Sequence, residues 1–316
     1  MRSIFGLLFL LIFISPSFSQ SPKITVAQDG TGNFKTVQQA FNSIPSNNKK
    51  PITIFIKNGI YYEKLFLDSN KNNITLTGED RFNTILTYND HTGKLSPKGD
   101  SINTRTSQSF LLAGNNFTAE NITFNNSSGP TAGQAVAVQA YGDKLVFKNC
   151  RFTGDQDVLF TINPNSRQYY EHCYIEGTTD FIFGAATAWF EQCHIHSKKN
   201  SHVTAASTPV DHKFGYVFND CVLTGDSALR AATLGRPWRP YASVTYIHCY
   251  IDKHIIPEGW NNWRNPENEK TARYAEYKSY GPGGTAALRF TWTRQLSDEE
   301  VKTFTLKNVF PGWEIH

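Results

Sequence analysis

The segment FKNCRF at residues 147–152 is the first of five copies of one six-residue pattern. In each copy a cysteine follows an apolar residue by three positions and precedes a second apolar residue by two. The other copies are YEHCYI (170–175), FEQCHI (190–195), FNDCVL (218–223) and YIHCYI (246–251). A short strand that recurs every 20 to 28 residues cannot bury its apolar face alone, so it has to stack on its neighbours in a solenoid. Alternating side chains and the lack of a helical pattern between copies predict a parallel β-helix.

Two earlier segments fit the pattern with isoleucine in the cysteine position, namely AENITF at 119–124 and, more loosely, KNNITL at 71–76. The residue before that position is always polar. We expect these polar residues to form a ladder at a corner of the coil and to bond their own backbone there. The ladder consists of Asn73, Asn121, Asn149, His172, Gln192, Asp220 and His248.

The five cysteines would lie about 4.8 Å apart on successive coils, which is close to the Cα spacing of a disulfide. One interpretation pairs Cys193 with Cys221 and Cys150 with Cys173, and leaves Cys249 free. The other is a buried ladder of reduced thiols that continues a stack of Ile74 and Ile122. The sequence favours neither interpretation.

Both ends of the chain carry their own signals. Arg2, an apolar run over 4–14 and the small residues Ser17 and Ser19 predict a signal peptide over residues 1–19. The run is too short to span a bilayer, and no later stretch is apolar enough to do so. We therefore expect a secreted protein without a membrane anchor, either extracellular or periplasmic if the source is a Gram-negative bacterium. Residues 20–316 are expected to form a single β-helix domain.

The solenoid also needs covered ends. Apolar residues at helical spacing predict an N-terminal capping helix: Val37, Ala40, Phe41 and Ile44. Pro45 ends this helix. Ser297 and Glu300 form a capping-box signal for a short helix near the C-terminus, and residues 257–295 are expected to be loops and tail strands packed on the side of the solenoid.

The composition excludes some partners. The chain is 39% hydrophobic and 18% charged, with a formal net charge of +4 that favours an acidic partner weakly. It has no cluster of lysine and arginine with interleaved aromatic residues, so nucleic acid is not an expected partner.

Two aspartates share one register. Asp157 lies seven residues after Cys150, and Asp180 lies seven residues after Cys173. Equal offsets place both carboxyls on adjacent rungs, with Gln134, 23 residues before Asp157, on the next rung. Two carboxyls this close do not both ionise freely, so one has a raised pKa and keeps its proton while the other is charged. This arrangement supplies an acid and a nucleophile side by side.

Other interpretations of the acidic and histidine residues remain. The stacked aspartates, together with Asp155, could form a solvated ladder or a calcium site. His194 and His196 form an H-x-H pair with no third metal ligand evident, which favours a place on the sheet surface. The serine esterase signature G-x-S-x-G does not occur in the chain.

The surrounding residues resemble the pectin methylesterase family from about Ile24 to Trp313. Five motifs carry the resemblance, in this order: GIYYE (59–63), QAVAV (134–138), GDQDVLF (154–160), DFIFG (180–184) and LGRPW (234–238). The resemblance implies a right-handed parallel β-helix that hydrolyses the methyl esters of homogalacturonan to pectate and methanol, acts as a monomer, and needs no metal or other cofactor.

The resemblance also implies a role for individual residues. Asp180 matches the nucleophile, Asp157 the general acid and base, and Arg236 the arginine bonded to the nucleophile. The remaining matches are to amide donors for the oxyanion (Gln134, Gln156), a sugar-stacking residue (Trp238) and a substrate contact (Thr104). Trp260 and Phe183 are expected to line the same cleft.

The chain departs from the family at Val158, where a threonine is usual, and in the loop 161–166, which is two residues longer than expected.

Two rival functions remain. One is a pectin-acting glycosidase or calcium-dependent lyase, although the chain lacks the NTD and GHG signatures of the former. The other is a carbohydrate-binding solenoid without catalysis, which predicts unchanged pectin binding and no turnover when either aspartate becomes asparagine.

Overall fold

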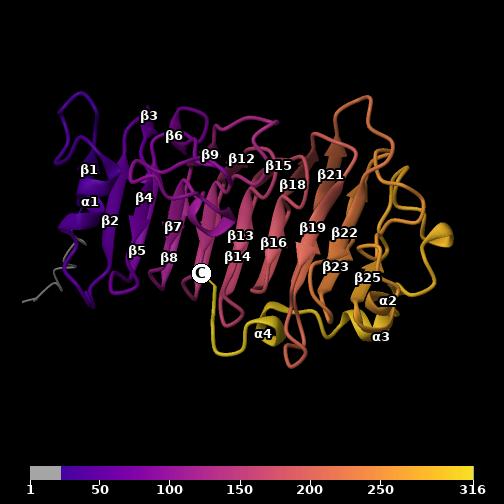
Figure 1. Cartoon of the computed structure of the whole chain (residues 1–316). Coiled ribbons are helices and arrows are strands. Elements are labelled where there is room, and N and C mark those ends of the chain that lie inside the picture. Colours follow the sequence, from indigo (N-terminus) through magenta and orange to yellow (C-terminus); the bar gives the residue numbers. More distant parts are fainter. Residues whose placement is uncertain (1–22, 316) are drawn as a thin grey trace, which may run out of the picture.

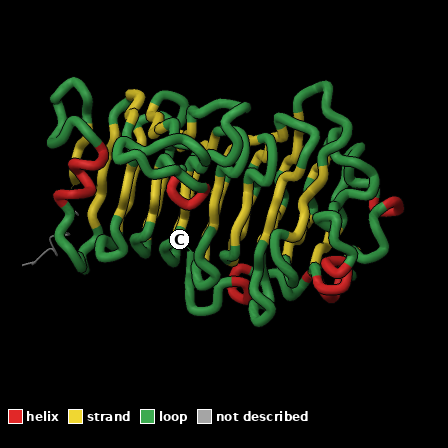
Figure 2. Tube along the Cα trace, viewed as in Figure 1, coloured by secondary structure: helices red, strands yellow, loops and turns green. Residues whose placement is uncertain are grey.

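The computed structural model describes residues 23–315. Its strands form three sheets with parallel pairing, which wind around one axis as a right-handed parallel β-helix (Figures 1 and 2). The fold expected from the repeated pattern and the resemblance is therefore confirmed. The expected signal peptide, residues 1–19, lies outside the described residues.

Within residues 23–315 the three sheets contain eleven, eight and seven strands. Sheet A consists of β1 (Lys23–Val26), β2 (Ile52–Ile56), β5 (Ile74–Gly78), β8 (Phe117–Glu120), β11 (Leu145–Lys148), β14 (Arg167–Glu171), β17 (Thr187–Glu191), β20 (Tyr216–Asn219), β23 (Ser243–Ile247), β25 (Arg273–Tyr277) and β26 (Arg294–Gln295). Sheet B consists of β3 (Gly59–Tyr62), β6 (Thr84–Tyr88), β9 (Thr123–Asn126), β12 (Arg151–Thr153), β15 (Tyr174–Gly177), β18 (His194–Ser197), β21 (Val222–Gly225) and β24 (Tyr250–Ile251). Sheet C consists of β4 (Leu65–Leu67), β7 (Phe110–Leu112), β10 (Val138–Ala140), β13 (Leu159–Thr161), β16 (Ile182–Gly184), β19 (His202–Ala206) and β22 (Thr233–Pro237).

The six-residue pattern is the corner at which the chain passes from sheet A to sheet B. The polar residue before the cysteine position has a left-handed backbone from Asn121 to His248, with φ between 49° and 57°. The side chains at this corner do not show the expected bonds to their own backbone: the Asn149 amide donates to Asn121 Oδ1 of the preceding coil at 2.5 Å, and Asp220 accepts from the side chain of Asn219 at 2.9 Å. The corner ladder was predicted correctly, but its hydrogen bonding was not.

The assignment of KNNITL to this corner is wrong. Ile74 begins β5 and pairs with Phe117, so it lies at the entry to sheet A. Thr84 occupies the cysteine position of that coil, because Ile85 pairs with Thr123 one residue further along. The stack that precedes the cysteines is therefore Thr84 and Ile122.

All five cysteines are free and buried, which favours the thiol ladder over the disulfides. The Sγ of Cys150 lies 3.5 Å from the Ala119 carbonyl oxygen of the preceding coil, and the Sγ of Cys221 lies 3.3 Å from that of Phe190. Burial raises the pKa of Cys150 to about 12. These thiols therefore act as small apolar groups with one weak hydrogen bond each.

An aromatic stack fills the interior beside this ladder. It is built from the first residue of each copy of the pattern, and successive ring centroids lie 4.4 to 5.0 Å apart: Phe147, Tyr170, Phe190, Phe218 and Tyr246. Offset stacking of this kind adds about 0.5–1.5 kcal/mol per pair to the burial itself.

Helix α1 (Val37–Ser43) covers the first coil, as expected (Figure 1). Its buried side chains are Val37, Ala40 and Phe41, and the Thr36 hydroxyl caps its N-terminus. The other helices lie late in the chain or in connections: η1 (Thr104–Thr106), α2 (Glu267–Thr271), η2 (Ala286–Leu288), α3 (Asp298–Val301) and α4 (Leu306–Val309). No helix within residues 23–315 has the length and apolar character needed to cross a membrane.

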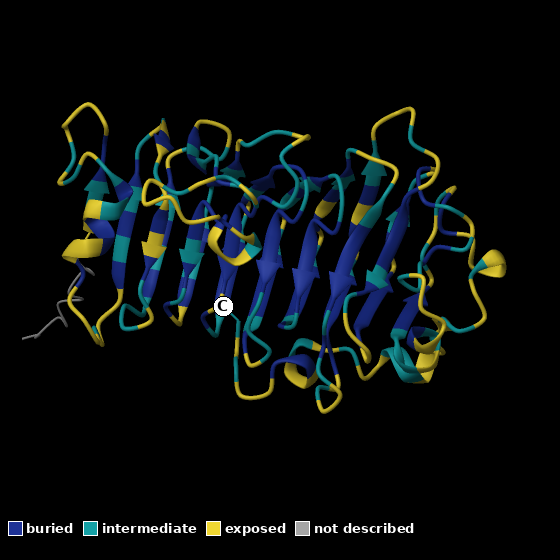
Figure 3. Ribbon diagram, in the orientation of Figure 1, coloured by how far each residue is buried: buried dark blue, intermediate teal, exposed yellow. Residues whose placement is uncertain are grey.

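The C-terminal segment packs on the outside of sheet A (Figure 1). Ser297 and Glu300 form the expected capping box of α3. Phe310 and Val309 are buried against an outward-facing row of apolar residues: Val146, Tyr169, Trp189, Val217, Ile247 and Tyr277. Figure 3 shows the strands buried and the exposed residues concentrated in the connections. The predicted packing of the C-terminal short helix on the side of the solenoid is confirmed. For residues 257–295 the expectation is wrong, because β25 and β26 extend sheet A and because Trp260 and Tyr274 belong to the core of the solenoid.

Candidate functional site

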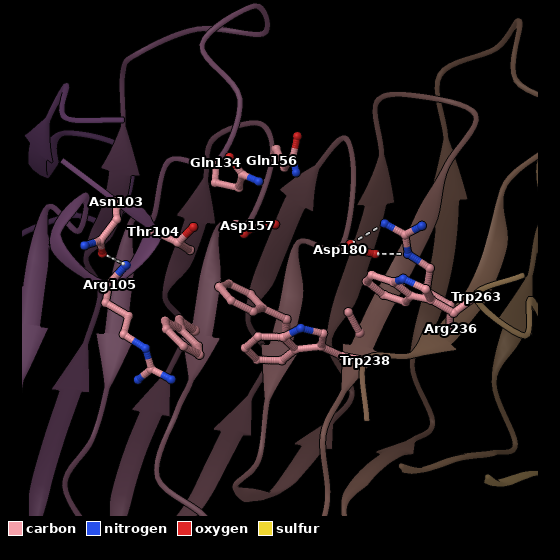
Figure 4. A pocket seen from close by; sticks show the side chains of 13 residues that line it. Asn103, Thr104, Arg105, Gln134, Gln156, Asp157, Asp180, Arg236, Trp238 and Trp263 are labelled. Carbon is pink, nitrogen blue, oxygen red and sulfur yellow. Dashed lines mark hydrogen bonds and ion pairs between the residues drawn. The ribbon is translucent and has the colours of Figure 1, made fainter. Parts of the chain in front are cut away.

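A cleft of about 480 Å³ lies on the outside of sheet C, near the middle of the solenoid (Figure 4). It is lined by Asn103, Thr104, Arg105, Gln134, Gln156, Asp157, Phe160, Asp180, Phe183, Ala205, Arg236, Trp238 and Trp263. Four of these residues occupy one position on four consecutive strands, from β13 to β22: Phe160, Phe183, Ala205 and Arg236. The parallel register therefore brings together side chains from distant parts of the sequence.

The two aspartates lie on adjacent coils in the register expected from their offsets. Leu159 pairs with Ile182, which places Asp157 beside Asp180, two residues before β13 and β16. The backbone N–H of Asp157 donates to the Thr179 carbonyl at 3.1 Å. Both aspartates have a left-handed backbone, with φ of 65° and 50°, a conformation that aspartate adopts more readily than most residues.

Arg236 binds Asp180 through two hydrogen bonds. Its Nε donates to one carboxylate oxygen at 2.9 Å and its Nη2 donates to the other at 2.6 Å. The bidentate geometry favours the ionised carboxylate and fixes its orientation. The ring of Trp263 packs against this guanidinium, with 3.7 Å between the Cζ of Arg236 and the ring centroid.

The two carboxyls differ in charge. Burial and then the charge of Asp180 hold the pKa of Asp157 well above its usual range, against weaker opposing effects of Arg236 and Gln156. Burial also raises the pKa of Asp180, but the hydrogen bonds and the charge of Arg236 oppose that effect. Asp180 is therefore the carboxyl that ionises first, while Asp157 keeps its proton.

The two glutamines lie next to each other on adjacent coils. Gln134 is on the rung expected, but its register differs from the one expected. Gln134 forms a parallel bridge with Gln156, and the Ala135 N–H donates to the Gln156 carbonyl at 3.0 Å. The offset of 23 residues from Asp157 therefore does not place Gln134 beside that aspartate, because the connection before β10 is irregular. Both side chains nevertheless line the cleft on the side of Asp157 (Figure 4).

Aromatic residues form the wall below the carboxyls. Phe160 and Phe183 stack with 4.2 Å between centroids, and Trp238 lies 5.8 Å from Phe183. Thr104 faces the same cleft from η1, and its hydroxyl lies 3.4 Å from that of Thr92. A row of this kind can carry the apolar faces of sugar rings.

Trp260 does not line the cleft. It is 1% exposed and stacks on Tyr274 at 4.2 Å inside the solenoid, where its indole N–H donates to Glu276. Of the two tryptophans in this segment, the one that lines the cleft is Trp263, three residues later. A single sequence offered no means to decide which tryptophan of GWNNW points outward, because both lie in an irregular connection.

The sequence interpretation also missed Phe160, Arg105, Asn103 and Ala205. Phe160 follows Asp157 by three residues, just as Phe183 follows Asp180, so the repeat itself contained the signal. Asn103 and Arg105 lie on a connection outside the repeat. Nothing in the repeat could have placed them.

The residues that suggested metal sites have protein partners. Asp155 lies 2.9 Å from Lys198 Nζ and is not among the residues that line the cleft. His194 and His196 lie on β18, and both rings contact the Thr224 hydroxyl, at 2.7 and 2.8 Å. Residues 23–315 contain no group of three histidine, cysteine or acidic side chains arranged to hold a metal ion.

Known proteins resemble this chain over nearly its whole length. A family model described as Pectinesterase matches residues 23–312. "Pectinesterase 31" of Arabidopsis thaliana is 41% identical over 286 residues, which cover 89% of this chain and 90% of that protein. The solved structure of a pectin methylesterase from carrot has a TM-score of 0.83 and 31% identity, covering 94% of this chain and 95% of that one. A pectin methylesterase solved in complex with a hexasaccharide has a TM-score of 0.82 and 28% identity, covering 94% and 99%.

Proposed function

Since the chain belongs to the pectinesterase family, we propose that it hydrolyses the methyl esters of homogalacturonan through an aspartyl acyl-enzyme. It is a carboxylic ester hydrolase that de-esterifies pectin. The observation that carries the mechanism is the pair formed by Asp180, ionised beside Arg236, and Asp157, protonated on the adjacent coil.

In the first step the Asp180 carboxylate attacks the ester carbonyl carbon. The carbonyl oxygen becomes an oxyanion, and we assign its stabilisation to the side-chain amides of Gln134 and Gln156, which line the cleft. Asp157 gives its proton to the departing methoxy oxygen, so methanol leaves and Asp180 becomes an acyl anhydride.

In the second step the roles of Asp157 reverse. Its carboxylate takes a proton from a water molecule, which attacks the acyl carbon. The bond to Asp180 breaks, and the galacturonate leaves as a free acid that ionises in solution. Both aspartates return to their starting charges, so no other reactant is needed.

Substrate binding is assigned to the rest of the cleft. The aromatic wall of Phe183 and Trp238 offers faces for sugar rings, and Thr104 offers a hydroxyl for a hydrogen bond. We also propose that the protein acts as a monomer, because the proposed chemistry assigns no step to a residue of a second copy. We also propose that the protein is secreted, because its substrate is an extracellular polymer and residues 1–19 carry the features of a signal peptide.

The test is methanol release from highly methylated pectin. We expect Asp180→Ala to lower kcat by about 10³-fold or more, since it removes the nucleophile. Asp211→Asn, a change at an exposed aspartate, serves as the control. Turnover that survives Asp180→Ala contradicts the mechanism.

A parallel assay for new reducing ends separates de-esterification from cleavage of the polymer. Reducing ends without methanol indicate a glycosidase or lyase, and sensitivity of turnover to a chelator indicates the lyase. Pectin binding by the wild type with no turnover indicates a binding protein.

A further inference from the structure

One arginine in the cleft has no acidic partner among the described residues. Arg236 is bound to Asp180, and Lys64 and Lys94 are both paired with Asp90. Arg105 lines the cleft, is exposed and forms no ion pair within residues 23–315. Its guanidinium lies over the ring of Phe160, with 5.7 Å between Cζ and the ring centroid. A guanidinium left free over an aromatic wall is a site for an anionic ligand.

The backbone that carries Arg105 is held in place. Asn103 caps η1, accepts the N–H of Arg105 at 2.9 Å, and forms a capping box with Thr106. The preceding loop is joined to the catalytic region by a bond from the Thr92 N–H to the Gln134 carbonyl at 2.9 Å. The backbone at Arg105 is therefore held in a fixed position near Gln134, one of the proposed oxyanion donors.

Arg105 and Arg236 lie at opposite ends of the cleft, with the aspartates between them (Figure 4). The Arg105 side chain extends away from Gln134 and toward the aromatic wall. Phe160, which it covers, lies on the coil of Asp157, and its neighbour Phe183 lies on the coil of Asp180. A polymer that lies along this wall with one unit at Asp180 therefore presents a neighbouring unit to Arg105.

We propose that Arg105 binds the free carboxylate of a galacturonate unit that neighbours the reacting methyl ester. This inference rests on the proposed function, because it concerns the same polymer in the same cleft. A methyl ester is neutral and offers only a carbonyl oxygen, whereas a carboxylate accepts two parallel hydrogen bonds from a guanidinium. The chain then acts preferentially beside units that are already de-esterified, and leaves blocks of free carboxylates.

A second hollow continues from this end of the cleft. It measures about 610 Å³, shares Asn103 with the first, and includes the exposed Lys98 beside Tyr88 and Ile102. Lys64 and Asp90 lie there as a pair, and Asp100 is the other acid. An anionic stretch of polymer that extends beyond Arg105 into this hollow can therefore pass a further cation, Lys98.

The experiment uses the full chain and two oligogalacturonides of equal length, one fully methyl-esterified and one with a single free acid. For each we measure kcat/KM of methanol release, and take the ratio of the second substrate to the first. Arg105→Gln is expected to lower this ratio by about tenfold, the usual size of one charged hydrogen-bonded contact. Arg230→Gln, at an exposed arginine outside the cleft, is the matched control and leaves the ratio unchanged.

Two further measurements guard against a folding defect. Arg105→Lys keeps the positive charge but loses the two parallel N–H donors of the guanidinium. Its ratio is therefore expected to fall between those of the wild type and Arg105→Gln. Calorimetric binding of fully de-esterified trimer to Asp180→Ala is expected to weaken about tenfold when Arg105→Gln is added.

The outcomes separate the two claims. Normal methanol release by the wild type with an unchanged ratio in Arg105→Gln overturns the carboxylate subsite and leaves the esterase intact. Absence of methanol release by the wild type overturns the proposed function and, with it, this inference. Added salt is expected to lower the ratio of the wild type and not that of Arg105→Gln, because screening weakens an exposed ionic contact.

Discussion

At the scale of the residue, each of the two aspartates has a strained backbone conformation and a buried side chain, which disfavours the charged carboxylate. Each has a positive φ and is less than one-tenth exposed. Burial raises the pKa of both carboxyls, and Arg236 opposes that effect at both through its charge, but it forms hydrogen bonds only with Asp180. The asymmetry that the chemistry needs therefore comes from one side chain, Arg236, located two strands further along sheet C.

Asp157→Asn is expected to stabilise the protein as the pH rises above about 3.8, the ordinary pKa of an aspartate. The folded pKa of Asp157 is raised, so the wild type loses stability between the unfolded and the folded pKa, whereas asparagine has no proton to lose. The gain grows by up to about 1.4 kcal/mol per pH unit in this window. Chemical denaturation at several pH values measures it.

Asp211→Asn, at an exposed position, is the control for this series and is expected to show no such growth. Parallel stability curves for Asp157→Asn and the wild type would show that Asp157 is ionised in the folded protein, against the proposed acid role.

At the scale of the element, the corner between sheets A and B explains both the success and the error of the repeat. The chain uses a left-handed residue at both ends of strands in sheet A. Asn121 lies at the exit from sheet A, whereas Asn73, Asn116 and Lys144 lie at its entry. A polar residue followed by an apolar one fits either place, so KNNITL was assigned to the wrong corner.

The cysteine column gives a prediction at this scale. In the folded protein none of the five thiols is expected to react with a thiol reagent, because all five are buried. Burial also raises the pKa of Cys150, Cys193, Cys221 and Cys249. All five are expected to react in denaturant without reductant. Titration of the unfolded chain that finds only one thiol would instead support two disulfides.

At the scale of the whole molecule, the tail and the site use different faces of the solenoid. The segment with α3 and α4 covers the outside of sheet A, while the cleft lies on the outside of sheet C. The polymer therefore has an open face, and the tail closes an apolar one that would otherwise be exposed to water.

Phe310→Ala is expected to lower the free energy of unfolding by about 3–5 kcal/mol, since a fully buried ring is removed. The KM for pectin is expected to stay unchanged, because none of the described residues of the tail lines the cleft. Phe290→Ala, at a ring that is 42% exposed, is the matched control and is expected to cost much less. A large change in KM with little loss of stability would show that the tail and the cleft are coupled.

The register of the fold was predictable wherever the repeat continues. Cys150 and Cys173 located Asp157 and Asp180 on adjacent coils, because a constant offset along the sequence is a constant position in a stacked coil. Gln134 fails this rule, since the coil before β10 is irregular and its glutamine pairs with Gln156. Trp260 and Trp263 lie outside the repeat altogether, so their spacing does not show which of the two side chains faces the cleft.

The amino-acid sequence by itself determined the solenoid, its N-terminal capping helix and the pairing of the two aspartates, because each follows from the local periodicity of side chains along the chain. Only the tertiary structure decided that Arg236 binds Asp180 through two hydrogen bonds, that Trp263 and not Trp260 faces the cleft, and that Arg105 has no acidic partner among residues 23–315. These facts depend on contacts between connections and distant coils. No periodic pattern encodes such contacts, since each is made once.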